Sequence, residues 1–229
     1  MVLAHFDPDA LDWFSASGPA PIPLTAAVTL DASGTVLGVG IGPEDQLCDT
    51  EIAWMDDGSW TAPHCRDEIK VFQHEVPVAP PRAVVLPNGD VVVVYHEDHV
   101  TIAATTLHAG VWSTPERVTL MEQSLDLAVT ATPAGDVIVG LGTLGVSALR
   151  YVPGVGWGEL VPIETFSELA WGISAAPGIC GDDAWIAYVT DEHWGEIRVA
   201  RVRGGAAEAS TVGASAEESL RHLSITTRP

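Results

Sequence analysis

The chain carries a short acidic segment with two histidines, His96-Glu97-Asp98-His99, between two strongly apolar stretches. Imidazole and carboxylate groups are ligands that divalent cations accept, and both form hydrogen bonds with polar ligands. We therefore take His96, Asp98 and His99 as candidate ligand-binding residues, and the acidic loops as a candidate site for a divalent cation. Neighbouring side chains in a short loop point apart, so the alternative is a solvated polar loop that binds nothing.

A second segment, Asp191 to Glu196, has a similar composition and contains His193 and Trp194. An exposed aromatic ring beside polar groups is a surface on which a sugar ring can stack. His193 and Trp194 are thus candidate ligand-binding residues. The alternative is that the indole folds over its own sheet.

Two further charged residues, Arg82 and Asp126, stand near the starts of segments that read as inner strands. A guanidinium pairs with a carboxylate through two hydrogen bonds, and acid–base hydrolysis of a glycoside needs two carboxyl groups. The starts of the other inner strands offer no second acid to accompany Asp126. We therefore expect Arg82 and Asp126 to bind a ligand, and we assign no catalytic residue and no cofactor.

The composition limits the partners of the protein. Its 31 acidic and 10 basic residues give a formal charge of −21, which repels nucleic-acid phosphates and anionic lipids and favours cations or basic partners. Solubility alone is the alternative reason for such a charge. There is no apolar run of membrane-spanning length and no signal-peptide pattern at the N-terminus. We expect a cytoplasmic protein that binds neither nucleic acid nor membrane.

The three cysteines, Cys48, Cys65 and Cys180, follow no metal-binding spacing. An odd number of cysteines argues against a disulfide framework. We expect three partly buried thiols in a reducing compartment.

The elements that position these residues belong to a repeat. Glycine-containing turns recur at spacings of 55, 46 and 46 residues, at Gly34, Gly89, Gly135 and Gly181. A tryptophan after a turn recurs at spacings of 47, 52 and 45 residues, at Trp13, Trp60, Trp112 and Trp157. A period of about 46 residues with four strand-like runs is typical of a β-propeller. We expect the recurring tryptophans to pack between sheets.

Each unit reads as four strands, which we call A to D from the axis outwards. Strand A is rich in small residues, and strand B is continuously apolar, as expected for a strand covered on both faces. In the first unit we expect a loop over Gly42–Glu51 and strand C over Thr50–Met55. The B–C loops and D–A links are long and acidic, so the face that carries them is the candidate binding face.

The repeat predicts a single all-β propeller domain over residues 1–229. Four units span residues 24–78, 79–124, 125–168 and 169–214, and residues 1–23 together with 215–229 form a shared closing blade, which gives five blades of about 46 residues. Because the closing blade lacks a strand, the alternatives are a three-stranded blade, completion by a second copy in a homo-oligomer, or a piece of a larger propeller.

These units resemble sialidase-like propellers of the BNR or Asp-box type. The overall size resembles that of five-bladed propeller lectins of the tachylectin-2 type. The resemblance rests on the Asn-Gly-Asp turn and on the elements Trp60–Pro63 and Trp112–Pro115. The nearest segment to an Asp box, Met55–Trp60, has Met in place of Ser and a shortened gap between Gly and Trp.

The sialidase resemblance implies a cluster of arginines and a tyrosine nucleophile. The inner strands offer only Arg82 and Arg221, at different repeat positions. None of the tyrosines has an acid partner at a matching position; they are Tyr95, Tyr151 and Tyr188. We therefore expect a non-catalytic propeller that binds a protein partner, such as a basic protein, or a ligand. A glycan-binding lectin is the first alternative and a sialidase-like glycoside hydrolase the second. Protein binding ranks first because the loops differ from unit to unit.

Overall fold

The structure is a computed structural model of the 229-residue chain. It describes residues 4–7, 12–15, 20–22, 24–29, 35–52, 59–72, 79–165, 171–179, 181–190 and 196–214. Their contacts divide the chain into two compact units, residues 1–73 and 74–229, and each unit is described by itself.

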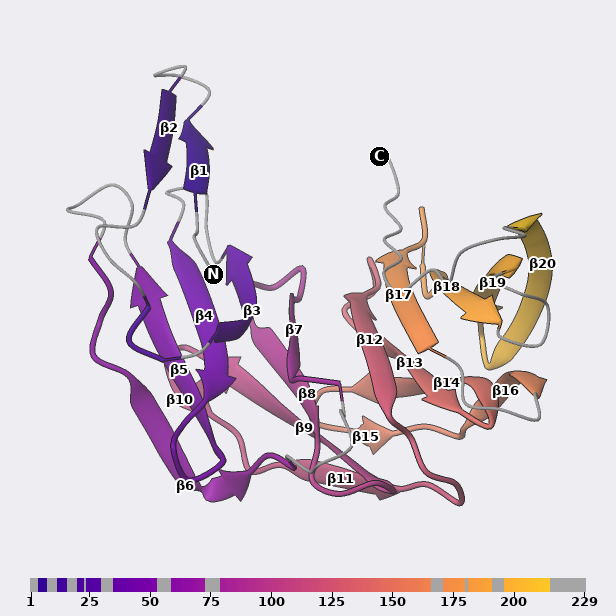
Figure 1. The fold of residues 1–229 in the computed structure, drawn as a ribbon, viewed down its shortest axis with the longest axis horizontal. Helices are drawn as coiled ribbons and strands as arrows, with labels where there is room; N and C mark the ends of the chain where they lie inside the picture. Colours follow the sequence, from indigo (N-terminus) through magenta and orange to yellow (C-terminus); the bar gives the residue numbers. More distant parts are fainter. Residues whose placement is uncertain are drawn as a thin grey trace. The chain divides into compact units, whose positions relative to one another are not determined.

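The first unit contains a two-stranded hairpin and a four-stranded sheet, both antiparallel (Figure 1). The hairpin consists of β1 (Ala4–Asp7) and β2 (Asp12–Ser15). The sheet consists, in spatial order, of β3 (Leu24–Thr29), β4 (Val36–Ile41), β5 (Gln46–Ile52) and β6 (His64–Lys70). Several apolar side chains on β4 and β5 are fully buried, among them Leu37, Val39 and Ile52.

The second unit contains three antiparallel sheets, each of which runs in chain order from its inner to its outer strand; in the first two sheets the outer strand consists of two pieces that both pair with the third strand. The first has β7 (Arg82–Val85), β8 (Val91–His96), β9 (Thr101–His108), β10 (Val111–Trp112) and β11 (Glu116–Thr119). The second has β12 (Asp126–Ala131), β13 (Val137–Thr143), β14 (Gly145–Val152), β15 (Gly156–Trp157) and β16 (Val161–Thr165). The third has β17 (Trp171–Pro177), β18 (Ala184–Thr190), β19 (Glu196–Arg203) and β20 (Ala206–Ala214).

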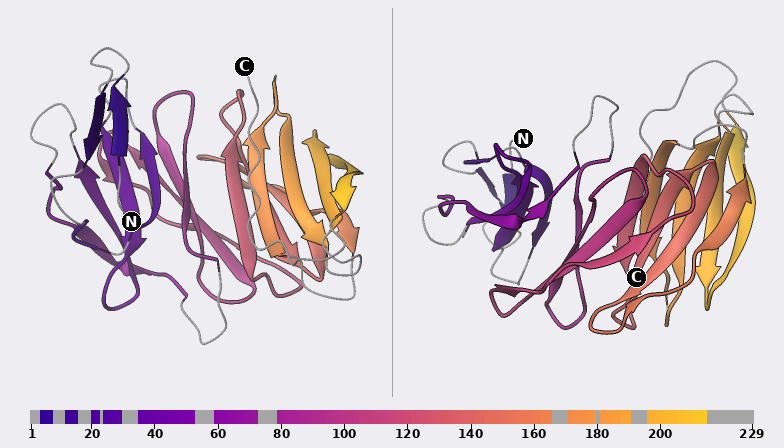
Figure 2. Two further views of the ribbon diagram at one scale, coloured as in Figure 1. Left: turned by 45° about the horizontal axis from the view of Figure 1, so that its top comes forward. Right: turned by 90° about the horizontal axis from the view of Figure 1, so that it is seen from below.

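These three sheets follow one another as blades do in a propeller (Figure 2). The inner strand β12 contacts the inner strands β7 and β17, and the outer strand β16 contacts β20. Two hydrophobic cores fill the spaces between successive sheets, one around Val94 and Leu141 and the other around Ile138 and Ile186. The described residues contain no helix, so the expected all-β class and four-stranded repeat are confirmed for them.

The apolar runs of β8 and β13 are continuous because these central strands are covered on both faces of their sheets. Every residue of β8 and of β13 is buried, as expected for strand B of a stacked sheet. The turn that enters strand B also matches its predicted position. Gly89, Gly135 and Gly181 all have positive φ, which glycine adopts without a steric penalty; Gly34 lies outside the described residues.

The outer strand of the first two sheets of the second unit is broken after its tryptophan. In the segment Trp112–Pro115, the Thr106 N–H donates to Ser113 Oγ at 2.9 Å, and Thr105 Oγ1 donates to the Ser113 carbonyl at 2.8 Å. The Ser113 hydroxyl thus holds the break between β10 and β11 against strand C.

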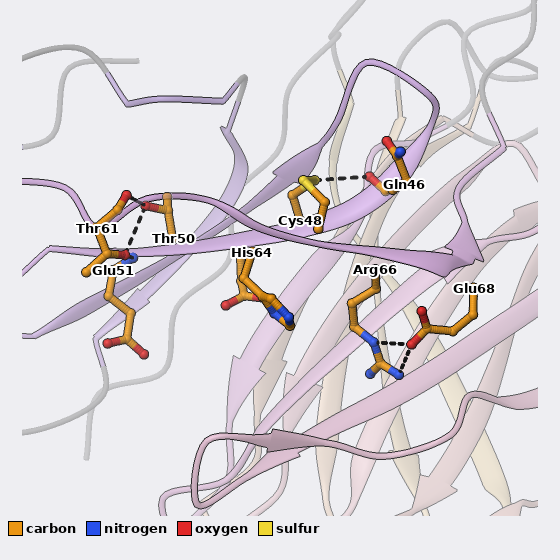
Figure 3. Close-up of polar contacts among 10 residues, drawn as sticks. Gln46, Cys48, Thr50, Glu51, Thr61, His64, Arg66 and Glu68 are labelled. Atoms are coloured by element: carbon orange, nitrogen blue, oxygen red, sulfur yellow. Dashed lines mark hydrogen bonds and ion pairs between the residues drawn. A yellow bond between two sulfur atoms is a disulfide. The ribbon is translucent and has the colours of Figure 1, made fainter.

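The segment Trp60–Pro63 of the first unit repeats this arrangement with Thr61 in place of serine (Figure 3). The Glu51 N–H donates to Thr61 Oγ1 at 2.9 Å, and Thr50 Oγ1 donates to the Thr61 carbonyl at 2.8 Å. The resemblance between the two Trp-containing segments therefore has a physical basis, which is the same pair of hydrogen bonds to strand C.

Two expectations for the first unit are wrong. Strand C begins at Gln46 rather than Thr50, and the expected loop over Gly42–Glu51 is only the four-residue turn at 42–45. The polar residues Gln46, Asp49 and Glu51 led to the loop prediction. They occupy a strand because β4 on one side and β6 on the other satisfy its backbone.

The cysteine prediction is also wrong for two of the three residues. Cys48 of β5 and Cys65 of β6 stand opposite each other in register, with Cα atoms 4.1 Å apart, and form a disulfide (Figure 3). The shift of strand C to Gln46 is what brings the two residues together. Cys180 lies outside the described residues.

The predicted closing blade is only partly described. The hairpin of β1 and β2 supplies two antiparallel strands from residues 1–23, whereas residues 215–229 lie outside the described part of the chain. Within that described part, no helix has the length and apolar character needed to cross a membrane.

Candidate functional site

Four of the polar residues predicted to bind a ligand make side-chain hydrogen bonds to other parts of the chain; they are Arg82, His96, Asp98 and Asp126. His96, the last residue of β8, is 1% exposed, and its Nε2 lies 3.3 Å from Ser124 Oγ. Burial is the main reason that the pKa of His96 falls from 6.5 to about 4, so the imidazole is neutral at physiological pH. The neutral ring of His96 thus connects β8 to the segment around Ser124 that leads into the next sheet.

The loop after β8 is ordered by Asp98. Its carboxylate accepts hydrogen bonds from the N–H groups of Val100 and Thr101 at 2.8 and 2.7 Å and from the Thr101 hydroxyl at 3.0 Å. These bonds lower the pKa of Asp98 against the opposing effect of desolvation, which is the largest single contribution. The carbonyl of His99 accepts a hydrogen bond from Ser124 N–H at 2.8 Å. Asp98 and His99 therefore shape the loop and anchor the next link.

Arg82 and Asp126 each connect neighbouring sheets. Arg82 Nε donates to the Leu127 carbonyl at 3.3 Å, from β7 to β12. Asp126 Oδ2 accepts the Ile173 N–H at 3.1 Å, from β12 to β17, while its Oδ1 accepts the N–H of Leu127. Both residues thus hold inner strands together, and a ligand at either would compete with these contacts.

The other predicted binding features of this face stay predictions. His193 and Trp194 lie outside the described residues. Among the described residues no group of three or more His, Cys, Asp or Glu side chains is placed to hold a metal ion. A divalent cation at the acidic loops is tested by comparing the melting temperature with and without calcium.

The outer junction between the first two sheets of the second unit is held by Glu116, Tyr151 and Trp157. The Tyr151 hydroxyl donates to Glu116 Oε1 at 2.8 Å, and Trp157 Nε1 donates to the Glu116 carbonyl at 3.0 Å. Mainly because of burial, the pKa of Tyr151 rises to about 12, so the phenol keeps its proton. The expected packing role of the recurring tryptophan is confirmed at Trp157.

The next junction uses the same chemistry with other residues. The Tyr188 hydroxyl donates to Glu164 Oε2 at 2.7 Å, and Arg198 forms an ion pair with the same carboxylate. Burial raises the pKa of Tyr188 to about 12, with a further contribution from the charge of Glu196. At each junction a tyrosine of the following sheet, on β14 or β18, thus binds a glutamate on the outer strand of the preceding sheet, and neither tyrosine is suited to be an ionised nucleophile.

Beside the first junction lies a hollow of about 320 Å³, which we call the β10 groove. One wall is sheet surface that includes Trp112, Glu116 and His108, and the other is the turn at Pro153 and Gly154. The His108 side chain at its rim pairs with Asp90, with Nδ1 and Oδ1 2.7 Å apart. The β10 groove therefore combines an indole face with a carboxylate.

Beside the second junction lies a hollow of about 350 Å³, which we call the β16 groove. Its first wall comes from the second sheet and includes Arg150, Glu159 and Leu160, and its second wall is the turn at Gly204 and Gly205 with Asp182. The Arg150 guanidinium forms an ion pair with Asp136 and lies 3.9 Å from Asp182. This groove combines apolar side chains with both signs of charge.

The two grooves occupy equivalent places in the repeat. Thr106 and Arg150 correspond, because Ser113 N–H donates to the Thr106 carbonyl and Gly158 N–H donates to the Arg150 carbonyl, both at 2.8 Å. The opposite walls correspond as well, since 153–154 and 204–205 are the tight turns that connect strands C and D. One hollow thus recurs at two successive junctions, with different side chains in each.

Sequence reasoning missed these grooves because it looked at the loop-rich face. A signal was present, however. Aligning the units on their tryptophans places Glu116, His108 and Arg150 beside the start of the outer strand. These positions line a hollow only because the C–D turn of one sheet packs against the neighbouring sheet.

No family model matches the chain, and the search of curated proteins found no match. Solved structures do match in fold. They include a point mutant of Aleuria aurantia lectin in complex with alpha-methyl-L-fucoside, with 14% identity, a TM-score of 0.61, and coverage of 93% of this chain and 72% of the lectin. AofleA from Arthrobotrys oligospora has 13% identity, a TM-score of 0.61, and coverage of 99% of this chain and 69% of its own.

A polysaccharide lyase, the ulvan lyase of family PL25, is also similar, with 11% identity, a TM-score of 0.58, and coverage of 96% of this chain and 67% of the lyase. This chain spans 64% and 50% of the length of two further matched chains. At these identities the similarity shows the fold alone.

Proposed function

We propose that this protein binds carbohydrates without catalysis, and that it binds them in the grooves between successive sheets of the second unit. The observation that carries the proposal is the recurrence of the hollow. The β10 groove and the β16 groove have equivalent places and similar volumes, about 320 and 350 Å³. A lectin built from repeated units needs a similar pocket in each unit. The loops differ from unit to unit and offer no such repeated pocket, which is why protein binding ranks first on the sequence alone.

The side chains in the grooves suit a sugar. A pyranose ring presents an apolar face that stacks on an aromatic ring, and its hydroxyl groups bond with carboxylates and guanidinium groups. Trp112 and Glu116 provide these features in the β10 groove, and Leu160 and Arg150 provide an apolar and a charged group in the β16 groove. The matched folds include a lectin with a bound fucoside and a polysaccharide lyase, which supports a carbohydrate ligand.

A glycan array identifies the ligand, and isothermal titration calorimetry then tests the grooves. Trp112→Ala removes the aromatic wall of the β10 groove, and Leu160→Ala removes an apolar wall of the β16 groove. We expect each substitution to remove one site from the binding stoichiometry, and the double variant to lose both. Val212→Ala is the matched control, because Val212 is 67% exposed on β20 and lines neither groove.

Retention of full binding by the double variant would move the site elsewhere, with the loop around His193 and Trp194 as the next place to test. Turnover of aryl glycosides by the purified protein would instead support the sialidase-like alternative.

A protein partner is the second candidate, and one surface feature favours it. Met121 is 98% exposed and Leu144 is 45% exposed, and both line a hollow of about 180 Å³ together with Glu122. An exposed apolar surface with an acidic rim suits a basic, partly apolar segment. Met121→Asp would abolish co-purification of such a partner and leave sugar binding unchanged.

For the architecture, we propose a five-bladed ring whose closing blade combines residues 1–23 with residues 215–229. The hairpin of β1 and β2 supplies two of its strands. Deletion of residues 215–229 should lower the melting temperature if these residues complete the blade. A dimeric mass in solution that reverts to a monomeric mass on deletion of residues 1–23 would instead favour completion by a second copy.

A further inference from the structure

We propose that the two grooves select glycans by charge. The favoured ligand class is an oligosaccharide of amino sugars with protonated amines, while neutral sugars bind more weakly and uronic or sulfated sugars are excluded. This inference rests on the proposed carbohydrate binding and adds the class of sugar.

The charges that line the β10 groove are negative. Glu116 lies in its wall, and neither lysine nor arginine is among its lining residues. The histidine at its rim, His108, is paired with Asp90. An ammonium group in this groove would lie between the Glu116 carboxylate and the face of Trp112, and both attract a cation.

The one arginine that lines the β16 groove is matched by acids. Arg150 forms an ion pair with Asp136 and lies 3.9 Å from Asp182, so two carboxylates share its charge. Glu159 lines the same groove, is exposed, and forms no ion pair with the residues that the structure describes. The charge that remains for a ligand in this groove is therefore negative.

Two arginines near the β16 groove do not reverse this sign. Arg201 and Arg203 both pair with Asp183, and the strand register places Glu208 opposite Arg201. The whole chain adds a formal charge of −21. Such a field attracts cationic ligands and repels anionic ones over a Debye length of roughly 10 Å at 0.1 M salt.

The experiment compares three oligosaccharides of the same length: one of glucosamine, one of N-acetylglucosamine and one of a uronic acid. Binding to the full chain is measured by calorimetry at a pH where the amines are protonated, at low and at high salt. We expect the affinity to fall in that order, and only the glucosamine oligomer to weaken strongly with added salt. Equal affinities, or tighter binding of the uronic acid oligomer, would overturn the charge selection and leave carbohydrate binding in place. If none of the three binds but the glycan array finds another sugar ligand, the charge selection fails and carbohydrate binding stands; if the array finds no ligand either, both proposals fail.

Substitutions then locate the selection. Glu116→Gln and Glu159→Gln each remove one groove charge, and glutamine at position 116 can still accept the Tyr151 hydrogen bond. We expect each variant to weaken glucosamine oligomer binding at its own groove roughly tenfold, as the loss of one charge-assisted hydrogen bond would, with little change for the N-acetylated oligomer.

Glu44→Gln is the control for net charge, because Glu44 is exposed and lines none of the hollows. An equal loss in this control would assign the effect to the general field of the protein and overturn the groove assignment. Displacement of the amino sugar by spermine at a matched concentration of amines would overturn it as well, because the sugar ring would then contribute nothing.

Discussion

The backbone N–H of Ile173, on the inner strand β17, donates a 3.1 Å hydrogen bond to the carboxylate of Asp126, on the inner strand β12 of the preceding sheet. Asp126 is the acid that sequence reasoning placed at the start of an inner strand and assigned to a ligand. In the structure that carboxylate satisfies a backbone group of the next sheet. We therefore expect the loss of this hydrogen bond to lower the stability of the fold.

Asp126→Ala should destabilise the fold by about 1–3 kcal/mol, because the Ile173 N–H would lose a charged acceptor in a half-buried place. Asp126→Asn should cost less, since the amide oxygen can still accept one of the two hydrogen bonds. Chemical denaturation followed by tryptophan fluorescence measures both changes. Equal stability of the alanine variant and the wild type would mean that the contact contributes nothing.

His96 should make the fold sensitive to acid. Burial lowers the pKa of His96 in the folded protein to about 4, below its ordinary value of 6.5. Above pH 6.5 neither the folded nor the unfolded state binds this proton, so the contribution to stability is fully present. As the pH falls from 6.5 to 4, the unfolded state takes up the proton first, and about 3 kcal/mol of stability is lost.

Denaturation midpoints measured across this pH range test the acid sensitivity. A His96→Gln variant should lose less stability than the wild type between pH 6.5 and 4, because it lacks the titrating group while the carboxylates remain common to both proteins. Parallel pH profiles would contradict the assignment.

The hydroxyl group after each outer tryptophan should be worth about 1–2 kcal/mol. Ser113→Ala and Thr61→Val leave the N–H groups of Thr106 and Glu51 without their side-chain acceptor. Thr61→Ser is the matched control, because it keeps the hydroxyl and should retain most of the stability. Thermal unfolding measures all three, and a loss in Thr61→Ser as large as in Thr61→Val would assign the effect to packing instead.

The disulfide between Cys48 and Cys65 should stabilise the first unit. It closes a loop between residues 17 positions apart, for which chain-entropy arguments give about 3 kcal/mol. In the oxidised protein one of the three cysteines should react with iodoacetamide after unfolding, and after reduction all three should react, as counted by mass spectrometry.

Reduction or the double substitution to serine should lower the melting temperature. Three reactive thiols in the protein purified without reductant would restore the prediction of free cysteines.

The sequence by itself determined the repeat. Strand B of each unit is apolar because it is covered on both faces, and the glycines at the A–B turns adopt positive φ, so both signals recur wherever a sheet does. The Trp60–Pro63 and Trp112–Pro115 elements were also visible, because local hydrogen bonds to strand C fix the residue types there. These features depend on near neighbours in the chain, which is why single-sequence reasoning could find them.

Tertiary structure alone decided the role of the polar residues. Gln46–Glu51 reads as a loop by composition, yet it forms a strand because the neighbours on both sides satisfy its backbone, and this pairing brings Cys48 to Cys65. Arg82, His96 and Asp126 have the chemistry of ligand-binding groups, but the next sheet, or the link that enters it, supplies their hydrogen-bond partners. The grooves likewise arise where a turn of one sheet meets the outer strand of another. The hydrogen bonds of Arg82, His96 and Asp126 join residues 45, 28 and 47 positions apart, and no local pattern records which residues will meet over such separations.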